Sequence, residues 1–270
     1  MCRCVDALMW RAWALVLLAC AAGLKAQPLD REAAFAASQA VLGRAAPEIT
    51  LLDREGRPLT LARFRGRPLL VSFVYTGCFQ ACPIGTRALH DAVEKINLAL
   101  GPEQYSVVSI GFNQPADSPQ AMKAFAAQHR VGNRNWDFLS APADQVEPLT
   151  RAFGFSHRST PAGIDHIAQV TLVDANGRIV HQIYGERPTA EDVAEPVRRL
   201  LRAEPLPPRA PWSDLVDRLR LLCTVYDPET GTYRVSYALA LEVAGGLTFA
   251  FAMAWFFLAE WRGRRRAGRR

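Results

Sequence analysis

The segment Pro68–Tyr75 constrains the fold more than any other part of this 270-residue chain. It reads Pro-Leu-Leu-Val-Ser-Phe-Val-Tyr, and such a nearly continuous apolar run predicts a β-strand that is covered on both faces. A loop over residues 76–82 follows, and Pro83 then suits the first position of a helix that runs to about Leu100. A buried strand that leads directly into a helix indicates an α/β sheet covered by helices.

The segments that follow continue this alternation. Strands are predicted at 105–112 and 136–139, and helices at 118–131 (capped by Asp117 or Ser118), 143–153 and 189–202. Turn signals predict one hairpin at 49–67 and another at 167–184. The periodicity alone fits several α/β folds. The order of elements favours a thioredoxin-like three-layer α/β sandwich with an added N-terminal hairpin over residues 46–202.

The N-terminal residues look unlike a soluble core. Residues 1–26 place two arginines ahead of or beside an uncharged apolar run that ends in small residues, the pattern of a secretory signal peptide cleaved near Ala26. A weaker alternative takes Leu17-Leu-Ala-Cys20 as a lipoprotein signal. Residues 27–45 then form an N-terminal extension ahead of the domain.

The C-terminal segment Tyr237–Ala259 carries a single charge, Glu242. About 20 apolar residues span a bilayer as a helix, so a transmembrane helix is predicted at 235–260. The basic tail at 261–270 contains six arginines and is expected to stay in the cytoplasm. The domain, joined to the helix by a linker at 203–234, is therefore expected in the periplasm of a bacterium, held at the inner membrane by a single-pass C-terminal anchor.

The formal net charge of +6 at pH 7 could suggest nucleic-acid binding. The six arginines of the tail account for all of this excess. The charge therefore reflects the predicted membrane topology, and no nucleic-acid partner is expected.

Six cysteines occur in the chain, and Cys2, Cys4 and Cys20 fall in the predicted signal peptide. Cys78 and Cys82 are separated by three residues at the junction of the buried strand and its helix. A helix N-terminus stabilises thiolates, so both the nucleophilicity and the metal affinity of this pair are expected to be raised. The spacing lets the sulfurs meet as a disulfide or as two ligands of one ion, and a purely structural disulfide is the alternative.

His166 directly precedes the second hairpin, which would lie near the cysteine loop in a thioredoxin-like domain. Two thiolates and one imidazole suit copper in either oxidation state. Zinc is the competitor, although structural zinc sites normally close with four protein ligands and no convincing fourth is evident. Cys223 is expected to be an unpaired thiol, a link to another chain or an auxiliary ligand. The remaining histidines are expected to be solvated: His90, His129, His157 and His181.

Three motifs together resemble the Sco/SenC family: Phe73-Val-Tyr-Thr-Gly-Cys-Phe-Gln-Ala-Cys-Pro83, Asp165-His166 and Val173-Asp-Ala-Asn-Gly177. The resemblance covers residues 46–201. It implies a thioredoxin fold, binding of Cu(I) or Cu(II) by Cys78, Cys82 and His166, and work on the copper centre of cytochrome c oxidase subunit II or another copper-dependent membrane oxidase. The chain departs from the family pattern at Phe79-Gln80, where Pro-Asp is common, and at Ile167, where Ser is common. These departures bear on copper affinity and redox poise.

Two functions of different classes follow from these residues. The first is a copper metallochaperone that passes its ion to a partner by ligand exchange, with reduction of the partner's cysteines as a second role. The alternative is a membrane-anchored thiol-disulfide oxidoreductase that uses Cys78 and Cys82 as redox-active thiols and needs no metal. A thiol peroxidase is supported least, because it would use a single cysteine with an arginine partner of its own. The sequence favours the metallochaperone over an enzyme.

Overall fold

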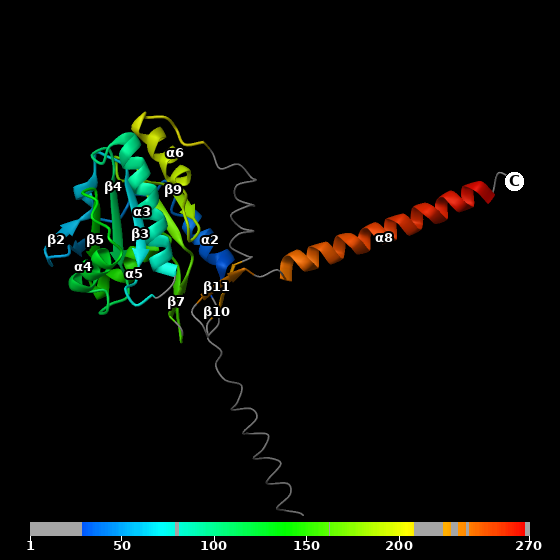
Figure 1. Cartoon of the computed structure of the whole chain (residues 1–270), viewed down its shortest axis with the longest axis horizontal. Coiled ribbons are helices and arrows are strands. Elements are labelled where there is room, and N and C mark those ends of the chain that lie inside the picture. Colours follow the sequence, from blue (N-terminus) through cyan, green and yellow to red (C-terminus); the bar gives the residue numbers. More distant parts are fainter. Residues whose placement is uncertain are drawn as a thin grey trace, which may run out of the picture.

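The computed structural model describes residues 29–78, 81–161, 163–207, 224–227, 232–235 and 238–267 (Figure 1). One mixed sheet of seven strands forms its centre, in the spatial order β2-β1-β5-β4-β3-β8-β9. The strands are β1 (Thr50–Leu52), β2 (Pro58–Thr60), β3 (Leu69–Val74), β4 (Ser106–Gly111), β5 (Trp136–Ser140), β8 (Gln169–Val173) and β9 (Ile179–Tyr184). Two smaller pairs are β6 (His157–Thr160) with β7 (Gly163–His166), and β10 (Thr224–Asp227) with β11 (Thr232–Val235).

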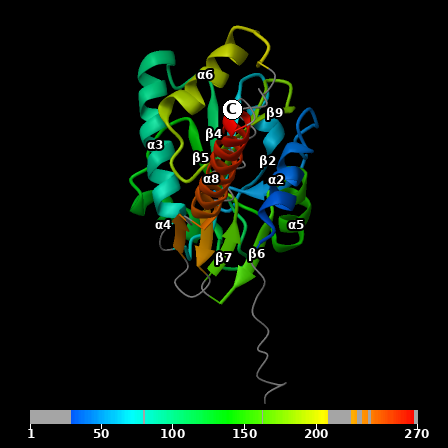
Figure 2. The ribbon, with the colours of Figure 1, turned by 90° about the vertical axis from the view of Figure 1, so that its right-hand side faces the viewer.

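Helices cover both faces of the sheet. Helices α3 and α6 pack against each other on one face, and α2 and α5 lie on the other (Figure 2). Helix α4 packs on β5. The helices are α2 (Arg31–Gln39), α3 (Ala81–Leu100), α4 (Pro119–Gln128), α5 (Ala143–Ala152), α6 (Ala190–Leu201) and α8 (Ala238–Ala267), with a 3₁₀ turn at Leu61–Phe64. This arrangement is the predicted three-layer α/β sandwich with an added N-terminal hairpin.

Strand β3 is central because all six of its residues are buried. It pairs in parallel with β4 along its whole length and antiparallel with β8 over Leu69–Ser72, so most of its backbone polar groups are hydrogen-bonded within the sheet. Helices on both faces cover its side chains, as the apolar run predicted. The C-terminal end of β3 therefore presents the residues that follow it, Tyr75 to Cys78, at one edge of a rigid core.

The structure differs from the predicted elements at three places. Helix α3 begins at Ala81 rather than at Pro83. The first turn of a helix tolerates the proline, because the N–H groups of that turn have no partner within the helix. Helix α2 falls within residues 27–45, where no helix was predicted; Asp30 caps it by accepting from the Ala33 N–H at 3.0 Å. The β6–β7 pair was also missed, and it extends beyond the end of the main sheet (Figure 1).

Two glycines allow close approaches that position the site. A Cβ at Gly111, the last residue of β4, would lie 2.6 Å from Cβ of Asp117 and 2.7 Å from Sδ of Met122. Gly154 has a φ of +62°, and a Cβ there would lie 2.6 Å from the carbonyl oxygen of Ala37 in α2. Any side chain would therefore push Asp117 away from β4 or push α2 away from the end of α5.

Several predictions concern residues outside this description. The signal peptide at 1–26, the pair Phe79-Gln80, most of the linker and Cys223 all lie outside the described residues. Among the residues described, no helix is both long and apolar enough to cross a membrane. The transmembrane helix at 235–260 stays a prediction.

Candidate metal centre

The structure brings Cys78 and Cys82 together. Cys78 ends a tight turn in which its N–H donates to the Tyr75 carbonyl at 3.1 Å. Cys82 lies in the first turn of α3, and its backbone N–H donates to Cys78 Sγ at 3.2 Å. The two side chains are 8% and 6% exposed and are free of any disulfide. A sulfur held against the N-terminus of a helix in this way is placed to bind a cation or to attack a disulfide.

Burial changes the acid–base behaviour expected of this pair. The pKa of the Cys82 thiol lies well above its usual value, first because it shares a hydrogen bond with Cys78 and then because burial disfavours the thiolate. The prediction that the helix N-terminus activates both thiols is therefore wrong for Cys82 in this state. The Cys82 thiol therefore holds its proton firmly, and a cation that binds both sulfurs has to displace it.

His166 ends β7 with its imidazole buried, only 5% exposed. Nδ1 lies 2.9 Å from the Ile164 carbonyl. A carbonyl only accepts, so Nδ1 carries the hydrogen and Nε2 keeps its lone pair for a ligand. Burial lowers the pKa of His166, with partial opposition from this hydrogen bond and from the negative charge of Cys78. The imidazole is therefore neutral at pH 7, the form that binds metals.

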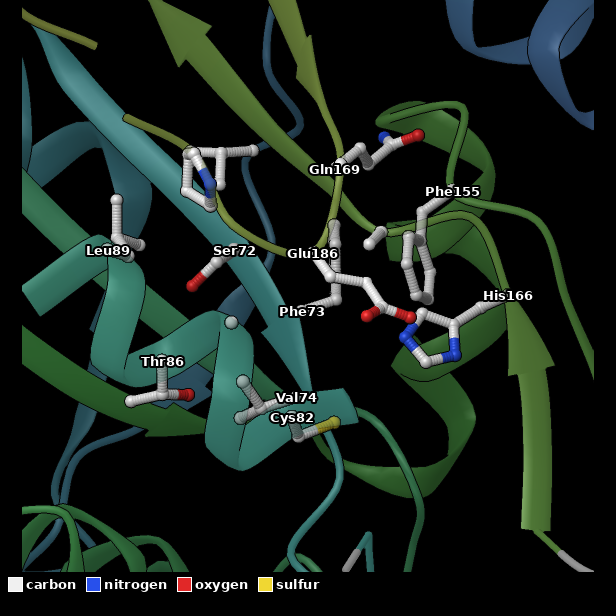
Figure 3. Close-up of a pocket in the computed structure, with 15 residues that line it drawn as sticks. Ser72, Phe73, Val74, Cys82, Thr86, Leu89, Phe155, His166, Gln169 and Glu186 are labelled. Atoms are coloured by element: carbon white, nitrogen blue, oxygen red, sulfur yellow. The ribbon is translucent and has the colours of Figure 1, made fainter. Parts of the chain in front are cut away.

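A cavity of about 50 Å³ lies between β3, α3 and the loop after β9, and both Cys82 and His166 line it. Figure 3 shows the Cys82 sulfur, the His166 imidazole and the Glu186 carboxylate turned toward this space. Burial raises the pKa of Glu186. The donor set of two thiols and an imidazole nitrogen fits a soft ion such as copper.

The three predicted ligands do not form a closed site. Among the described residues, no group of three His, Cys, Asp or Glu side chains is close enough to hold a metal ion. The structure thus pairs the two cysteines and turns His166 toward the same cavity as Cys82.

Aromatic rings surround the imidazole. The ring centroid of His166 lies 5.5 Å from that of Phe155 and 6.3 Å from those of Tyr75 and Phe112. The ring of Phe73 stacks on that of Phe155, with the two centroids 4.6 Å apart. These rings exclude water from one side of the cavity and lower the local dielectric, which strengthens any bond between the thiols and a cation.

Asp117 is a site residue whose role was not predicted from the sequence. Its Oδ1 accepts from the backbone N–H and the hydroxyl of Thr76 at 2.7 and 2.8 Å, and its Oδ2 accepts from the Asn113 N–H at 2.8 Å. Ser118, and not Asp117, caps α4. Asp117 is fully buried, and burial raises its pKa despite these hydrogen bonds. It fixes the loop that carries Cys78. The sequence analysis considered Asp117 only as a possible cap of the helix that follows it.

Tyr75 connects the cysteine loop to the histidine strand. Its hydroxyl accepts from the Ile164 N–H at 3.3 Å, and Ile164 also holds the His166 ring. Burial raises the pKa of Tyr75, as does the negative charge of Cys78. The two halves of the candidate site are therefore joined by a neutral phenol.

The other histidines do not all behave as predicted. His129 is buried, 7% exposed, and its ring lies 4.4 Å from that of Phe125. His157 is partly buried, with its ring 5.0 Å from that of Phe112. Burial lowers the pKa of both. The expectation that they are solvated is wrong, because each faces an aromatic ring of the core.

Comparisons with known proteins identify the family of this chain. The family model described as SCO1/SenC matches residues 39–202. The SCO1 protein homolog of Bacillus subtilis is 24% identical over 147 residues, which are 53% of this chain and 75% of that protein.

Solved structures are similar in fold. ScoI of Bradyrhizobium japonicum, determined with copper bound, superposes with a TM-score of 0.50 at 20% identity, covering 58% of this chain and 99% of that one. BsSco, described as a member of the Sco family of cytochrome c oxidase assembly proteins with a disulfide switch, gives a TM-score of 0.54 at 22% identity, covering 60% and 96%. These similarities confirm the thioredoxin-like fold. Because the family model spans more than half of the chain, this protein belongs to the SCO1/SenC family.

Proposed function

We propose that this protein is a copper metallochaperone that binds one copper ion through Cys78, Cys82 and His166. The observation that carries the proposal is the arrangement of donors. Two buried cysteines lie side by side, and a neutral imidazole whose Nε2 carries the lone pair turns toward the cavity that Cys82 lines. The copper bound to ScoI of Bradyrhizobium japonicum supports the choice of ion.

The copper ion is the cargo of this site rather than a permanent cofactor. It takes the place of the thiol protons of Cys78 and Cys82, and the His166 imidazole supplies the third donor. Three protein ligands leave a coordination position open. A ligand of an acceptor protein therefore enters before a ligand of the donor leaves, and the ion is never released into water.

We propose that the acceptor is the copper centre of cytochrome c oxidase subunit II, or of another copper-dependent membrane oxidase. The membership of BsSco in a family of cytochrome c oxidase assembly proteins supports the first of these. A membrane anchor fits either acceptor, because tethering raises the effective concentration of the domain near a membrane-embedded partner.

The anchor itself is proposed from the sequence. The segment Tyr237–Ala259 carries one charge and is followed by an arginine-rich tail, which places the domain outside the cytoplasm, in the periplasm. The described part of α8 exposes many of its large apolar side chains, including Leu247, Phe249, Phe251 and Trp255. A bilayer would cover these side chains.

A second candidate function is reduction of the acceptor's cysteines. The adjacent cysteines, which form no disulfide, favour it. The Cys78 sulfur would attack an acceptor disulfide to form a mixed disulfide, and Cys82 would then attack Cys78 and release the second acceptor thiol. Two electrons and two protons pass to the acceptor, and Cys78 and Cys82 end as a disulfide. This reaction does not require His166.

Replacing His166 with alanine distinguishes the two candidates. The variant should bind Cu(I) at least about tenfold more weakly, because one of three donors is lost, whereas its rate of disulfide reduction should stay within about twofold of the wild type. The measurement is an anaerobic competition titration of the full chain in detergent micelles. His181→Ala, on β9 and outside the cavity lining, is the matched control. Copper binding that is indifferent to His166 would leave thiol-disulfide exchange as the function.

A further inference from the structure

Helix α2 lies almost wholly before the segment that matches the family model, which begins at residue 39. It nevertheless contacts the two neighbours of His166, Asp165 and Ile167. It packs behind the strand that ends in His166. The residues on either side of His166 are both held by this helix and the residues that lead into it, in two different ways.

The first contact is polar and involves Asp165. Its Oδ2 accepts from the Leu29 N–H at 3.0 Å, and its Oδ1 accepts from an Nη of Arg31 at 3.3 Å. The side chains of Arg31 and Asp165 are 13% and 1% exposed. This pair is the buried salt bridge of the described chain; the others have at least one partner that is more than a fifth exposed.

The second contact is apolar and involves Ile167. It is 1% exposed and forms a small cluster with Ala34 and Phe35 of α2, separate from the main core. The Phe35 ring lies 5.1 Å from that of Tyr184 on β9. The Tyr184 hydroxyl in turn lies 2.8 Å from Oγ of Ser38, so α2 is fixed to the sheet at its other end.

These two contacts leave one direction for His166. Asp165 and Ile167 are held by the α2 segment, while the imidazole between them lines the cavity shared with Cys82 (Figure 3). A twist of the strand that turned His166 away from the cavity would also pull Asp165 or Ile167 from its partner. A buried carboxylate that leaves its cation and hydrogen bonds pays a large desolvation cost, which opposes this twist.

We propose that α2 is a clamp that positions His166 as a copper ligand, with Arg31 and Phe35 as its two positioning residues. The helix holds Asp165 and Ile167, and the residue between them, His166, therefore stays directed at the cavity. The role of the clamp in copper binding rests on the proposed function. Its effect on the orientation of His166 applies to the metal-free protein as well.

The test uses the full chain in detergent micelles with Arg31→Met, Arg31→Lys, Phe35→Ala and Arg151→Met. Arg151 is the matched control, because its ion pair with Glu147 lies on the exposed surface of α5. The metal-free readout is the rate at which diethyl pyrocarbonate modifies His166, followed by mass spectrometry. The copper readouts are the rate of Cu(I) transfer to a chelator and the nitrogen hyperfine signal of the Cu(II) form.

In Arg31→Met, diethyl pyrocarbonate should modify His166 at least about fivefold faster than in the wild type, because the segment around His166 opens locally. This variant should also lose Cu(I) about tenfold faster and show a weaker imidazole nitrogen signal, as expected when the support of a ligand is removed. Arg31→Lys should recover part of both effects. The reaction of the thiols with a disulfide reagent should change less than about twofold, and Arg151→Met should match the wild type.

Unchanged modification of His166 in both Arg31→Met and Phe35→Ala, with each variant folded, would overturn the clamp. A wild type that retains no copper would instead refute the proposed function, and the modification rates would still decide whether α2 positions His166. Faster modification with an unchanged copper transfer rate would show that the clamp does not act on the ligand, and would overturn the proposal as stated.

Discussion

Replacing Cys82 with serine is expected to abolish tight copper binding, with a loss of Cu(I) affinity of at least about a thousandfold. The serine hydroxyl has nearly the shape of the thiol. It stays protonated and is a hard donor, so it does not bind a soft ion. The measurement is the copper retained by the full chain after anaerobic loading and desalting. The wild type should retain one copper per chain and the variant almost none.

The control for this loss is Cys223→Ser, which removes a thiol from the connector between the domain and the predicted anchor. It should retain the same copper as the wild type and thereby exclude an auxiliary role for that thiol. Full copper retention by Cys82→Ser would show that the thiol pair is not the site. Loss in Cys223→Ser would show that the ligand set is larger than the one proposed.

Replacing Asp117 with alanine is expected to lower the free energy of unfolding by about 3 kcal/mol. Two backbone N–H groups and a hydroxyl donate to its carboxylate, and truncation leaves these donors without an acceptor in a buried position. Burial raises the pKa of Asp117, so the buried charge carries a cost of its own, and this cost limits the net loss. Urea unfolding of the metal-free full chain measures the effect.

Asp117→Asn is the matched variant, because it keeps the shape and one oxygen acceptor while removing the charge. It should lose less stability than alanine, and Cys78 should react with a disulfide reagent at a rate nearer to that of the wild type. A loss below about 1 kcal/mol in Asp117→Ala would mean that the Thr76 loop holds its position without this carboxylate.

The local signals of the sequence predicted the centre of this molecule well. The apolar run at 68–75 predicted β3, and the turn residues around Gly56 and Gly177 predicted two hairpins that the structure contains. The junction between this strand and the helix that follows it also predicted that Cys78 and Cys82 lie side by side. These predictions succeeded because each depends on residues that are neighbours in the chain, where periodicity and turn preferences act directly.

The parts that were missed depend on contacts between distant segments. The Asp117 carboxylate meets Thr76 across 41 positions, and the Leu29 N–H meets Asp165 across 136. Neither pairing leaves a periodic pattern in the sequence. His129 is a different case, because Phe125 lies only four residues before it, at a spacing that brings side chains of a helix together, and the prediction overlooked this local contact.

The raised pKa of Cys82 shows the limit of an argument from position alone. A helix N-terminus favours a thiolate, but the hydrogen bond to Cys78 and the burial of the pair outweigh that field. In the metal-free protein Cys82 is therefore a protonated thiol at pH 7 and not a permanently activated nucleophile.

The most direct test of the copper site is X-ray absorption spectroscopy at the copper edge on the full chain loaded with one equivalent of Cu(I). The account predicts a copper ion with two sulfur neighbours and one imidazole nitrogen, and a spectrum without the imidazole contribution in His166→Ala. A copper ion bound by sulfur alone in the wild type, or a spectrum that does not change in His166→Ala, would contradict it.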